Sequence, residues 1–182
     1  RKINAVMSTS AGRLFDGVSA ILGIRRKSTF EGEASMALEF VAEEYQKNRL
    51  KNAKKMPEIP TYELLKEGND RLLLNTGSLI KEILYRRLNG EDSDRLAYIF
   101  HQELARQITA SCVKIREQSG CNKAALSGGV FQNRLLLELT DHMLKQQGFE
   151  VLKHQLVPPN DGGIALGQAV YAMAYLDRNR NK

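Results

Sequence analysis

The chain has 182 residues, 42% of them hydrophobic, and a formal net charge of +6 at pH 7. This size suits one globular domain with a single core. The sequence contains no apolar run of about 18 residues, so no membrane span is predicted. The basic residues stand in separate groups without interleaved aromatic residues, which disfavours nucleic acid as a partner. Two cysteines, Cys112 and Cys121, are too few for a disulfide framework and indicate reduced thiols in a cytoplasmic protein.

The first half of the chain is predicted to be mainly helical. Apolar residues recur at helical spacing over residues 11–22 and 34–48, which indicates one helix in each stretch. Residues 50–75 are expected to form a linker and a small β insertion, because charged residues and prolines give way there to two short strand patterns. We place these strands at residues 61–65 and 71–74.

The second half is predicted to continue with two helices and then to alternate between strand and helix. The two helices cover residues 76–88, capped by Thr76 or Ser78, and residues 93–118. The order that follows is strand, helix, strand, helix, which favours parallel pairing of the strands with a right-handed crossover. These four elements are predicted over residues 122–126, 133–147, 150–152 and 161–176.

The stretch LSGGVFQNR, residues 126–134, carries the strongest functional signal. Two glycines leave room for a ligand against the backbone, and a helix that begins just after them directs unpaired N–H groups and a partial positive charge toward it. We therefore interpret Ser127, Gly128 and Gly129 as a cradle for a phosphate or another anion, the alternative being a tight structural turn. Asn133 either reaches a ribose or base or faces solvent.

A second turn, PPNDGG at residues 158–163, is similar in design and adds a carboxylate. Asp161 either caps the last helix or binds a divalent metal ion, since hard cations in phosphate sites use one or two carboxylates. Because each turn follows a strand and opens a helix, we expect the two turns to lie side by side at one end of the sheet and to face a common cleft.

Further candidates are scattered along the chain. Asp16 lies among apolar helix positions and needs a partner, which ribose hydroxyls or a lysine would supply. Gly32 provides another turn of close approach at a helix start. The three histidines, His101, His142 and His154, form no i, i+4 pair and are interpreted as helix, surface or packing residues. These candidate residues favour a chemistry that works by positioning a substrate and neutralising its charge, as in phosphoryl transfer.

Four segments together resemble the HypF family of hydrogenase maturation carbamoyltransferases. They read STSAGRLFDGVSAILGI, EGEASMALE, SGGVFQNRLL and VPPNDGGIALGQ, in this order along the chain. The resemblance implies that residues 1–182 are a single domain, the C-terminal half of the family's Kae1-like (TsaD-like) domain. The implied fold class is α/β, the C-terminal lobe of an actin-like ATPase (ASKHA, ribonuclease H-like) fold, largely helical with a small mixed sheet.

The resemblance also implies a function. Members of this family form carbamoyl-adenylate from carbamoyl phosphate and ATP, and the Kae1-like domain passes the carbamoyl group to the C-terminal cysteine of the partner HypE. The cyanide ligands of the nickel–iron hydrogenase derive from this group. Catalytic residues are not assigned. The implied nucleotide contacts, to ATP or carbamoyl-adenylate, are Asp16, Gly32, Ser127, Gly128, Gly129 and Asn133.

The metal site implied by the resemblance is incomplete in this chain. Asp161 is the implied ligand of a divalent ion (Fe, Zn or Mg), and the family's His-x-x-x-His pair is expected upstream of Arg1 together with the remaining HypF domains. We therefore expect no carbamoyl transfer by these 182 residues alone. Two alternatives stay open: tRNA threonylcarbamoyl transfer of the Kae1/TsaD type, which the positive charge suits, and a non-catalytic docking module.

Overall fold

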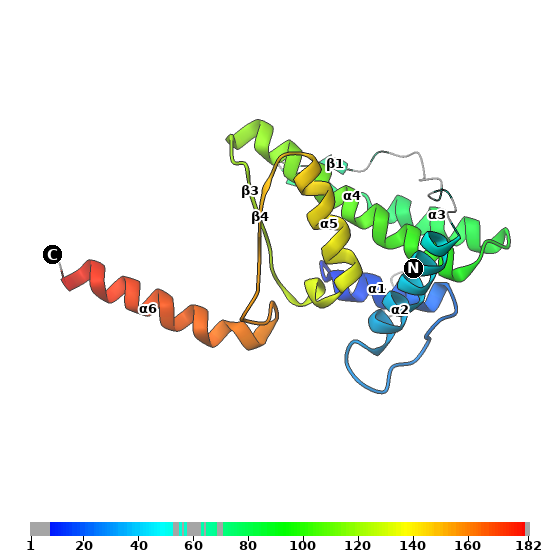
Figure 1. Ribbon diagram of the computed structural model, residues 1–182, viewed down its shortest axis with the longest axis horizontal. Helices are drawn as coiled ribbons and strands as arrows, with labels where there is room; N and C mark the ends of the chain where they lie inside the picture. Colours follow the sequence, from blue (N-terminus) through cyan, green and yellow to red (C-terminus); the bar gives the residue numbers. More distant parts are fainter. Residues whose placement is uncertain are drawn as a thin grey trace.

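The structure is a computed structural model that describes residues 8–52, 55, 57, 63, 65–68 and 71–180. It consists of a helical body from which the last helix, α6, extends away (Figure 1). The helices are α1 (Ala11–Ile21), α2 (Glu33–Lys51), α3 (Thr76–Leu88), α4 (Ser93–Ser119), α5 (Arg134–Gln146) and α6 (Ile164–Arg180). Two short 3-10 helices, η1 (Gly129–Gln132) and η2 (Asp161–Gly163), and the strands β1 (Leu65–Gly68), β2 (Arg71–Leu74), β3 (Lys123–Leu126) and β4 (Glu150–Lys153) complete the described elements.

The helix starts follow from local capping chemistry. Ser10 caps α1, as its hydroxyl accepts a hydrogen bond from the backbone N–H of Arg13 at 3.4 Å. The cap of α3 is Asn75, whose side chain accepts from the N–H of Ser78 at 3.3 Å. The prediction of Thr76 or Ser78 as this cap was therefore wrong, because the helix begins at Thr76 and the side chain of the buried Asn75 accepts the bond.

The long helix α4 is the centre of the core. It packs against α2, α3 and α5, and α2 also packs against α1. The rings of Phe15 on α1 and Phe100 on α4 meet edge to face with centroids 5.0 Å apart, an arrangement favoured by aromatic quadrupoles. Fully buried apolar side chains hold these helices together, and burying each one stabilises the fold by about 1.5–3 kcal/mol. They include Val18, Leu38, Leu79, Ile83, Leu96, Ile99, Leu135 and Leu136.

The strands form two separate two-stranded sheets rather than one mixed sheet. Strands β3 and β4 pair in parallel, as predicted, with α5 as the crossover between them, and their register runs from Lys123↔Glu150 to Leu126↔Lys153. Strands β1 and β2 are antiparallel. Strand β1 covers residues 65–68, so the prediction of residues 61–65 was wrong in its boundaries, and residues 61, 62 and 64 lie outside the described part of the chain.

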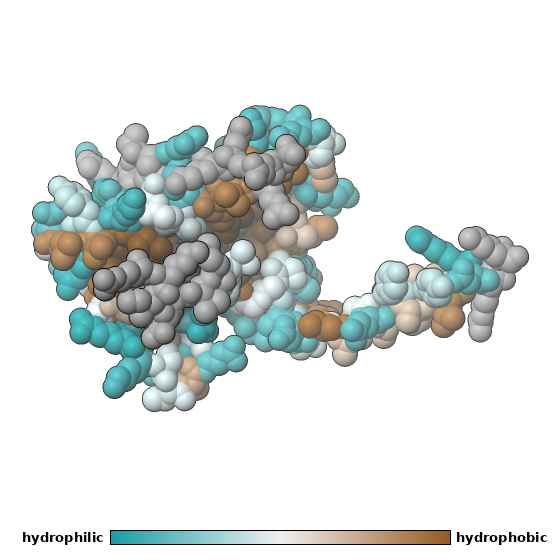
Figure 2. All heavy atoms as spheres, turned by 180° about the vertical axis from the view of Figure 1, so that it is seen from behind, coloured by the Kyte–Doolittle hydropathy of each residue, from teal (hydrophilic) through white to brown (hydrophobic). Residues whose placement is uncertain are grey.

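The end of the chain departs most from the predicted helix over residues 161–176. A 3-10 turn, η2, comes first, and α6 then runs from Ile164 to Arg180. All the side chains described on α6 are exposed, and its apolar residues are open to solvent in Figure 2. Within the described residues, no helix is both long and apolar enough to cross a membrane.

Candidate functional site

The two glycine turns lie side by side at the carboxyl ends of β3 and β4. The backbone N–H of Gly128 donates a hydrogen bond to the carbonyl oxygen of Pro159 at 2.8 Å. A Cβ placed on Gly129 would lie 3.9 Å from Cβ of Asn160, so the turns touch. The predicted juxtaposition is confirmed, and it falls at the edge of the parallel pair where α/β folds bind their ligands.

The first turn offers free hydrogen-bond donors. Gly128 has a φ of 98°, which side chains rarely adopt, and nothing lies within 4 Å of where its Cβ would be. The chain then forms η1, and the N–H groups of Gly129 and Val130 donate to no residue in the described part of the chain. These two amides and the open space at Gly128 are compatible with an anion site, and the cradle of Ser127, Gly128 and Gly129 stays a prediction.

The first N–H groups of α5 are not unpaired, contrary to the prediction. The carboxylate of Glu39 on α2 accepts hydrogen bonds from the N–H groups of Arg134 at 2.6 Å and Leu135 at 3.4 Å. The side chain of Asn133 accepts from the N–H of Leu136 at 2.8 Å. Side chains of the protein therefore satisfy the first amides of the helix. Burial raises the pKa of Glu39, although the two backbone hydrogen bonds oppose that rise.

Asn133 is a buried N-cap, so the solvent-facing alternative is wrong. Its side-chain amide contacts Nε2 of His101 at 3.1 Å, and Nδ1 of His101 lies 2.7 Å from the carbonyl oxygen of Ala97. Complete burial lowers the pKa of His101 to about 4, which keeps the ring neutral at pH 7. We assign the proton to Nδ1, because a carbonyl only accepts, and Nε2 then accepts from Asn133.

The second turn differs from the first in what its glycines do. Asn160 is the cap, since its side chain accepts from the N–H of Gly162 at 3.1 Å. A Cβ on Gly163 would lie 2.9 Å from the carbonyl oxygen of Pro158, so this turn needs glycine for its own packing. The exposed carboxylate of Asp161 forms no hydrogen bond or ion pair with the described residues. The capping role predicted as the alternative for Asp161 belongs to its neighbour.

The only carboxylate of the second turn, PPNDGG, is that of Asp161. Within the described residues, no group of three or more His, Cys, Asp and Glu side chains is placed to hold a metal ion. The free carboxylate of Asp161 fits a hard cation that takes its other ligands from elsewhere. Its role as a metal ligand stays a prediction.

Asp16 lies on α1, and Gly32 is the residue just before α2. Helix α1, which carries Asp16, packs against η1. The half-buried Asp16 pairs with Arg13 at 3.1 Å, so its partner is an arginine of the same helix rather than a lysine. Gly32 precedes α2 in the left-handed region, with a φ of 83°, and its carbonyl oxygen accepts from the Ser35 hydroxyl at 2.8 Å. Nucleotide contacts at both residues stay predictions.

One residue at the site escaped the sequence reasoning. Nε2 of His154 lies 2.8 Å from the hydroxyl oxygen of Ser127. The register of the parallel pair explains this contact, because Leu126 pairs with Lys153 and the next residue of each strand follows in step. The predicted parallel pairing of the two strands indicates that the residues after them lie near each other. The contact between Ser127 and His154 also depends on the register of the strands, which the sequence did not predict.

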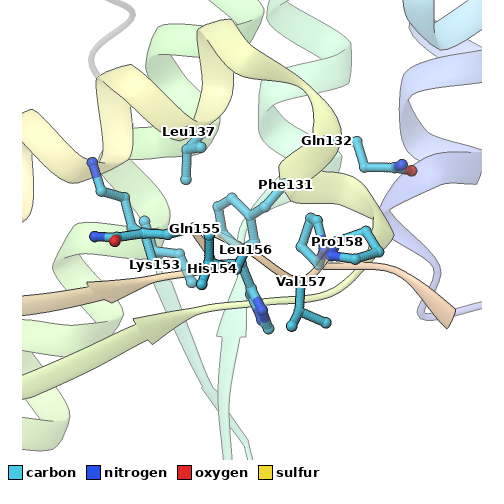
Figure 3. Close-up of a pocket in the computed structure, with 11 residues that line it drawn as sticks. Phe131, Gln132, Leu137, Lys153, His154, Gln155, Leu156, Val157 and Pro158 are labelled. Carbon is cyan, nitrogen blue, oxygen red and sulfur yellow. The ribbon is translucent and has the colours of Figure 1, made fainter. Parts of the chain in front are cut away.

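A cavity of about 250 Å³ lies beside this contact. Phe131 and Leu137 point toward the segment that follows β4 and give the cavity an apolar floor (Figure 3). Lys153, His154 and Gln155 contribute polar groups to its lining. The cavity therefore adjoins the glycine turns on the side of the β4 segment.

Comparison with known proteins identifies the family. Residues 1–168 match the family model described as "Carbamoyltransferase, Kae1-like Domain, second subdomain". The chain belongs to the HypF carbamoyltransferase family. It is 35% identical to the probable carbamoyltransferase HypF of Methanocaldococcus jannaschii over 98% of this chain and 21% of that protein. With the carbamoyltransferase HypF of Rhodobacter capsulatus it shares 37% identity over 97% of this chain and 21% of that protein.

A solved HypF structure has the same fold. The crystal structure of full-length HypF in the phosphate- and nucleotide-bound form matches with a TM-score of 0.79 and 37% identity, over 97% of this chain and 22% of that chain. The fold class predicted from the resemblance, a largely helical Kae1-like subdomain of the ASKHA class, is confirmed. The chain spans about a fifth of the length of these HypF relatives.

Proposed function

We propose that this chain is the second half of the Kae1-like domain of a HypF carbamoyltransferase and acts in hydrogenase maturation. In this proposal the domain binds carbamoyl-adenylate, made from carbamoyl phosphate and ATP, and transfers the carbamoyl group to the C-terminal cysteine of HypE. The observation that carries it is the hydrogen bond from Gly128 to Pro159, which joins the turn with two free amides to the turn that carries the free carboxylate of Asp161. A homologous structure was solved with phosphate and nucleotide bound.

Most of the predicted nucleotide-site residues have a place in this reaction. The amides of Gly129 and Val130 hold a phosphate oxygen of the nucleotide, and Ser127 adds a hydroxyl beside them. Asp16 and Gly32 contact the nucleoside from α1 and the start of α2. Asn133 acts by fixing the start of α5. The sulfur of the HypE thiolate attacks the carbamoyl carbon, the bond to the phosphate oxygen breaks, and AMP leaves with the electron pair.

Asp161 is the contribution of this chain to the metal site. A divalent ion bound there would neutralise charge on the phosphate. The other ligands, and the domains that make carbamoyl-adenylate, belong to other parts of the protein in this proposal. We therefore expect no transfer to HypE by the 182 residues alone, and HypE carbamoylation by them would contradict this.

The test is Asp161→Asn in the full form of the protein that its gene encodes. The substitution removes the charge but keeps the size, and Asp177→Asn on the exposed helix α6 is the matched control. We expect carbamoylation of HypE, measured by mass spectrometry, to fall by at least tenfold in Asp161→Asn and to stay unchanged in Asp177→Asn. A loss of about tenfold or more is typical when a metal site is perturbed. Unchanged carbamoylation in Asp161→Asn, with the fold intact, would support a docking module instead.

One comparison favours a second candidate function, threonylcarbamoyl transfer to tRNA. A tRNA N6-adenosine threonylcarbamoyltransferase of Francisella philomiragia is 25% identical over 93% of this chain and 48% of that protein. The net charge of +6 suits a polyanion. Binding of tRNA that weakens steeply as salt rises would favour this candidate, because phosphate contacts release counterions. The higher identity to HypF relatives makes it the second choice.

A further inference from the structure

The contact between Ser127 and His154 joins the predicted anion cradle to the segment that leads into the second turn. The two side chains, 2.8 Å apart, are the first residues after β3 and β4. A second link, from the N–H of Gly128 to Pro159, follows one residue later at 2.8 Å. The segment 154–159 therefore fixes both the side chain and the backbone of the first turn.

Both members of the pair are accessible to a ligand. Ser127 and His154 are exposed, and Ser127 immediately precedes the turn whose Gly129 and Val130 amides are free. A hydroxyl oxygen at this point can accept one hydrogen bond and donate another. If Ser127 accepts a hydrogen bond from His154, its own hydroxyl proton is left to donate to a bound ligand. If Ser127 donates to His154, its oxygen can only accept from the ligand.

A nucleophile and its general base would need a third group. In such sites an acid or carbonyl orients the imidazole through its second nitrogen. Nδ1 of His154 makes no hydrogen bond with any residue that the structure describes. The geometry therefore favours an orienting contact over an activated serine.

We propose that His154 is a positioning residue for Ser127 in phosphate binding. Nε2–H of His154 donates to the Ser127 hydroxyl oxygen, so that the hydroxyl proton of Ser127 points to a phosphate oxygen held by the Gly129 and Val130 amides. Three donors then converge on one anion, two from the backbone and one from a side chain that another strand holds in place. This inference rests on the proposed nucleotide site of the HypF family and adds a residue to it.

The test is ATP binding, measured by calorimetry on the protein in the full form that its gene encodes. His154→Ala removes the donor, whereas His154→Gln places an amide N–H where Nε2 stood. His142→Ala, at an exposed position of α5, is the control for losing a histidine. We expect His154→Ala to raise the Kd for ATP roughly five- to tenfold, the effect of one hydrogen bond, and His154→Gln and His142→Ala to change it less than about twofold.

The double variant separates positioning from an independent contact. In a Ser127→Ala background, His154→Ala should raise the Kd for ATP by less than about twofold, because the group it positions is absent. Multiplicative effects of the two substitutions, or equal losses in His154→Ala and His154→Gln, would overturn the inference and leave the nucleotide site intact. If the unmodified protein binds no ATP, the proposed function fails and the inference fails with it.

Discussion

The buried histidine at the centre of the fold makes a testable demand on stability at acidic pH. His101 packs edge-on against Phe15 and Phe100, with ring centroids 5.3 and 5.7 Å away, and has no exposed surface. Its pKa in the folded protein is about 4, whereas an unfolded histidine keeps a value near 6.5. Between these values the unfolded chain binds a proton that the folded chain excludes, so acid favours unfolding.

The magnitude follows from the width of that window. Each pH unit contributes about 1.4 kcal/mol, so the free energy of unfolding should fall by about 3 kcal/mol from above pH 6.5 to pH 4 through His101 alone. The carboxyl of Glu39 acts in the opposite direction, because its raised pKa makes the folded state hold a proton above pH 4.5 that the unfolded state has lost. A comparison with a variant therefore isolates the histidine.

His101→Gln is the variant to compare. At pH 7 it should be less stable by about 1–3 kcal/mol, since packing against the two rings is lost. Urea unfolding followed by circular dichroism at pH 7 and pH 4.5 should show a loss of about 2–3 kcal/mol in the unmodified protein that the variant does not show. The control His142→Gln, at an exposed site, should keep the full loss. Parallel losses in His101→Gln and the unmodified protein would refute the assignment.

Three further predictions concern stability, each read from urea unfolding. Glu39→Ala should lower the free energy of unfolding by about 2–3 kcal/mol, because it leaves two amides of α5 without an acceptor, the partly buried one of Arg134 and the buried one of Leu135. Glu39→Gln should lower it by about 1 kcal/mol, and equal costs would contradict a role for the charge of the carboxylate. Gly163→Ala should cost about 1–3 kcal/mol through its contact with Pro158, and a neutral outcome would show that the second turn adapts. Gly17→Ala should stabilise α1 by about 0.8 kcal/mol, as nothing lies within 4 Å of the new methyl group, and a loss would reveal a contact at that face.

Local patterns in the sequence were sufficient for the helices and for the placement of the two turns. Helical spacing located α1, α2 and α4, and the alternation of strand and helix predicted the parallel pairing that puts Gly128 beside Pro159. These features depend on neighbours in sequence or on a general rule of chirality, and both are visible in a single chain.

The details of the site required contacts that no spacing reveals. Glu39 reaches the amide of Arg134 across 95 residues, and that contact pairs an N–H group at the start of α5 that the sequence predicted to be free. The choice between Asn160 and Asp161 as cap depends on one backbone conformation, because both residue types suit the position. His154 gained its place from the register of two strands.

The bare helix at the end of the chain has a practical consequence for anyone who prepares these 182 residues. Val170, Tyr171 and Met173 keep more than half of their surface in water, and they stand on a rod that the rest of the molecule leaves uncovered. Exposed apolar side chains of this kind favour self-association, which a high protein concentration and sulfate would promote. Purification in dilute, low-salt buffer, or a shortened chain that stops before Ile164, is the sensible starting point for crystallisation.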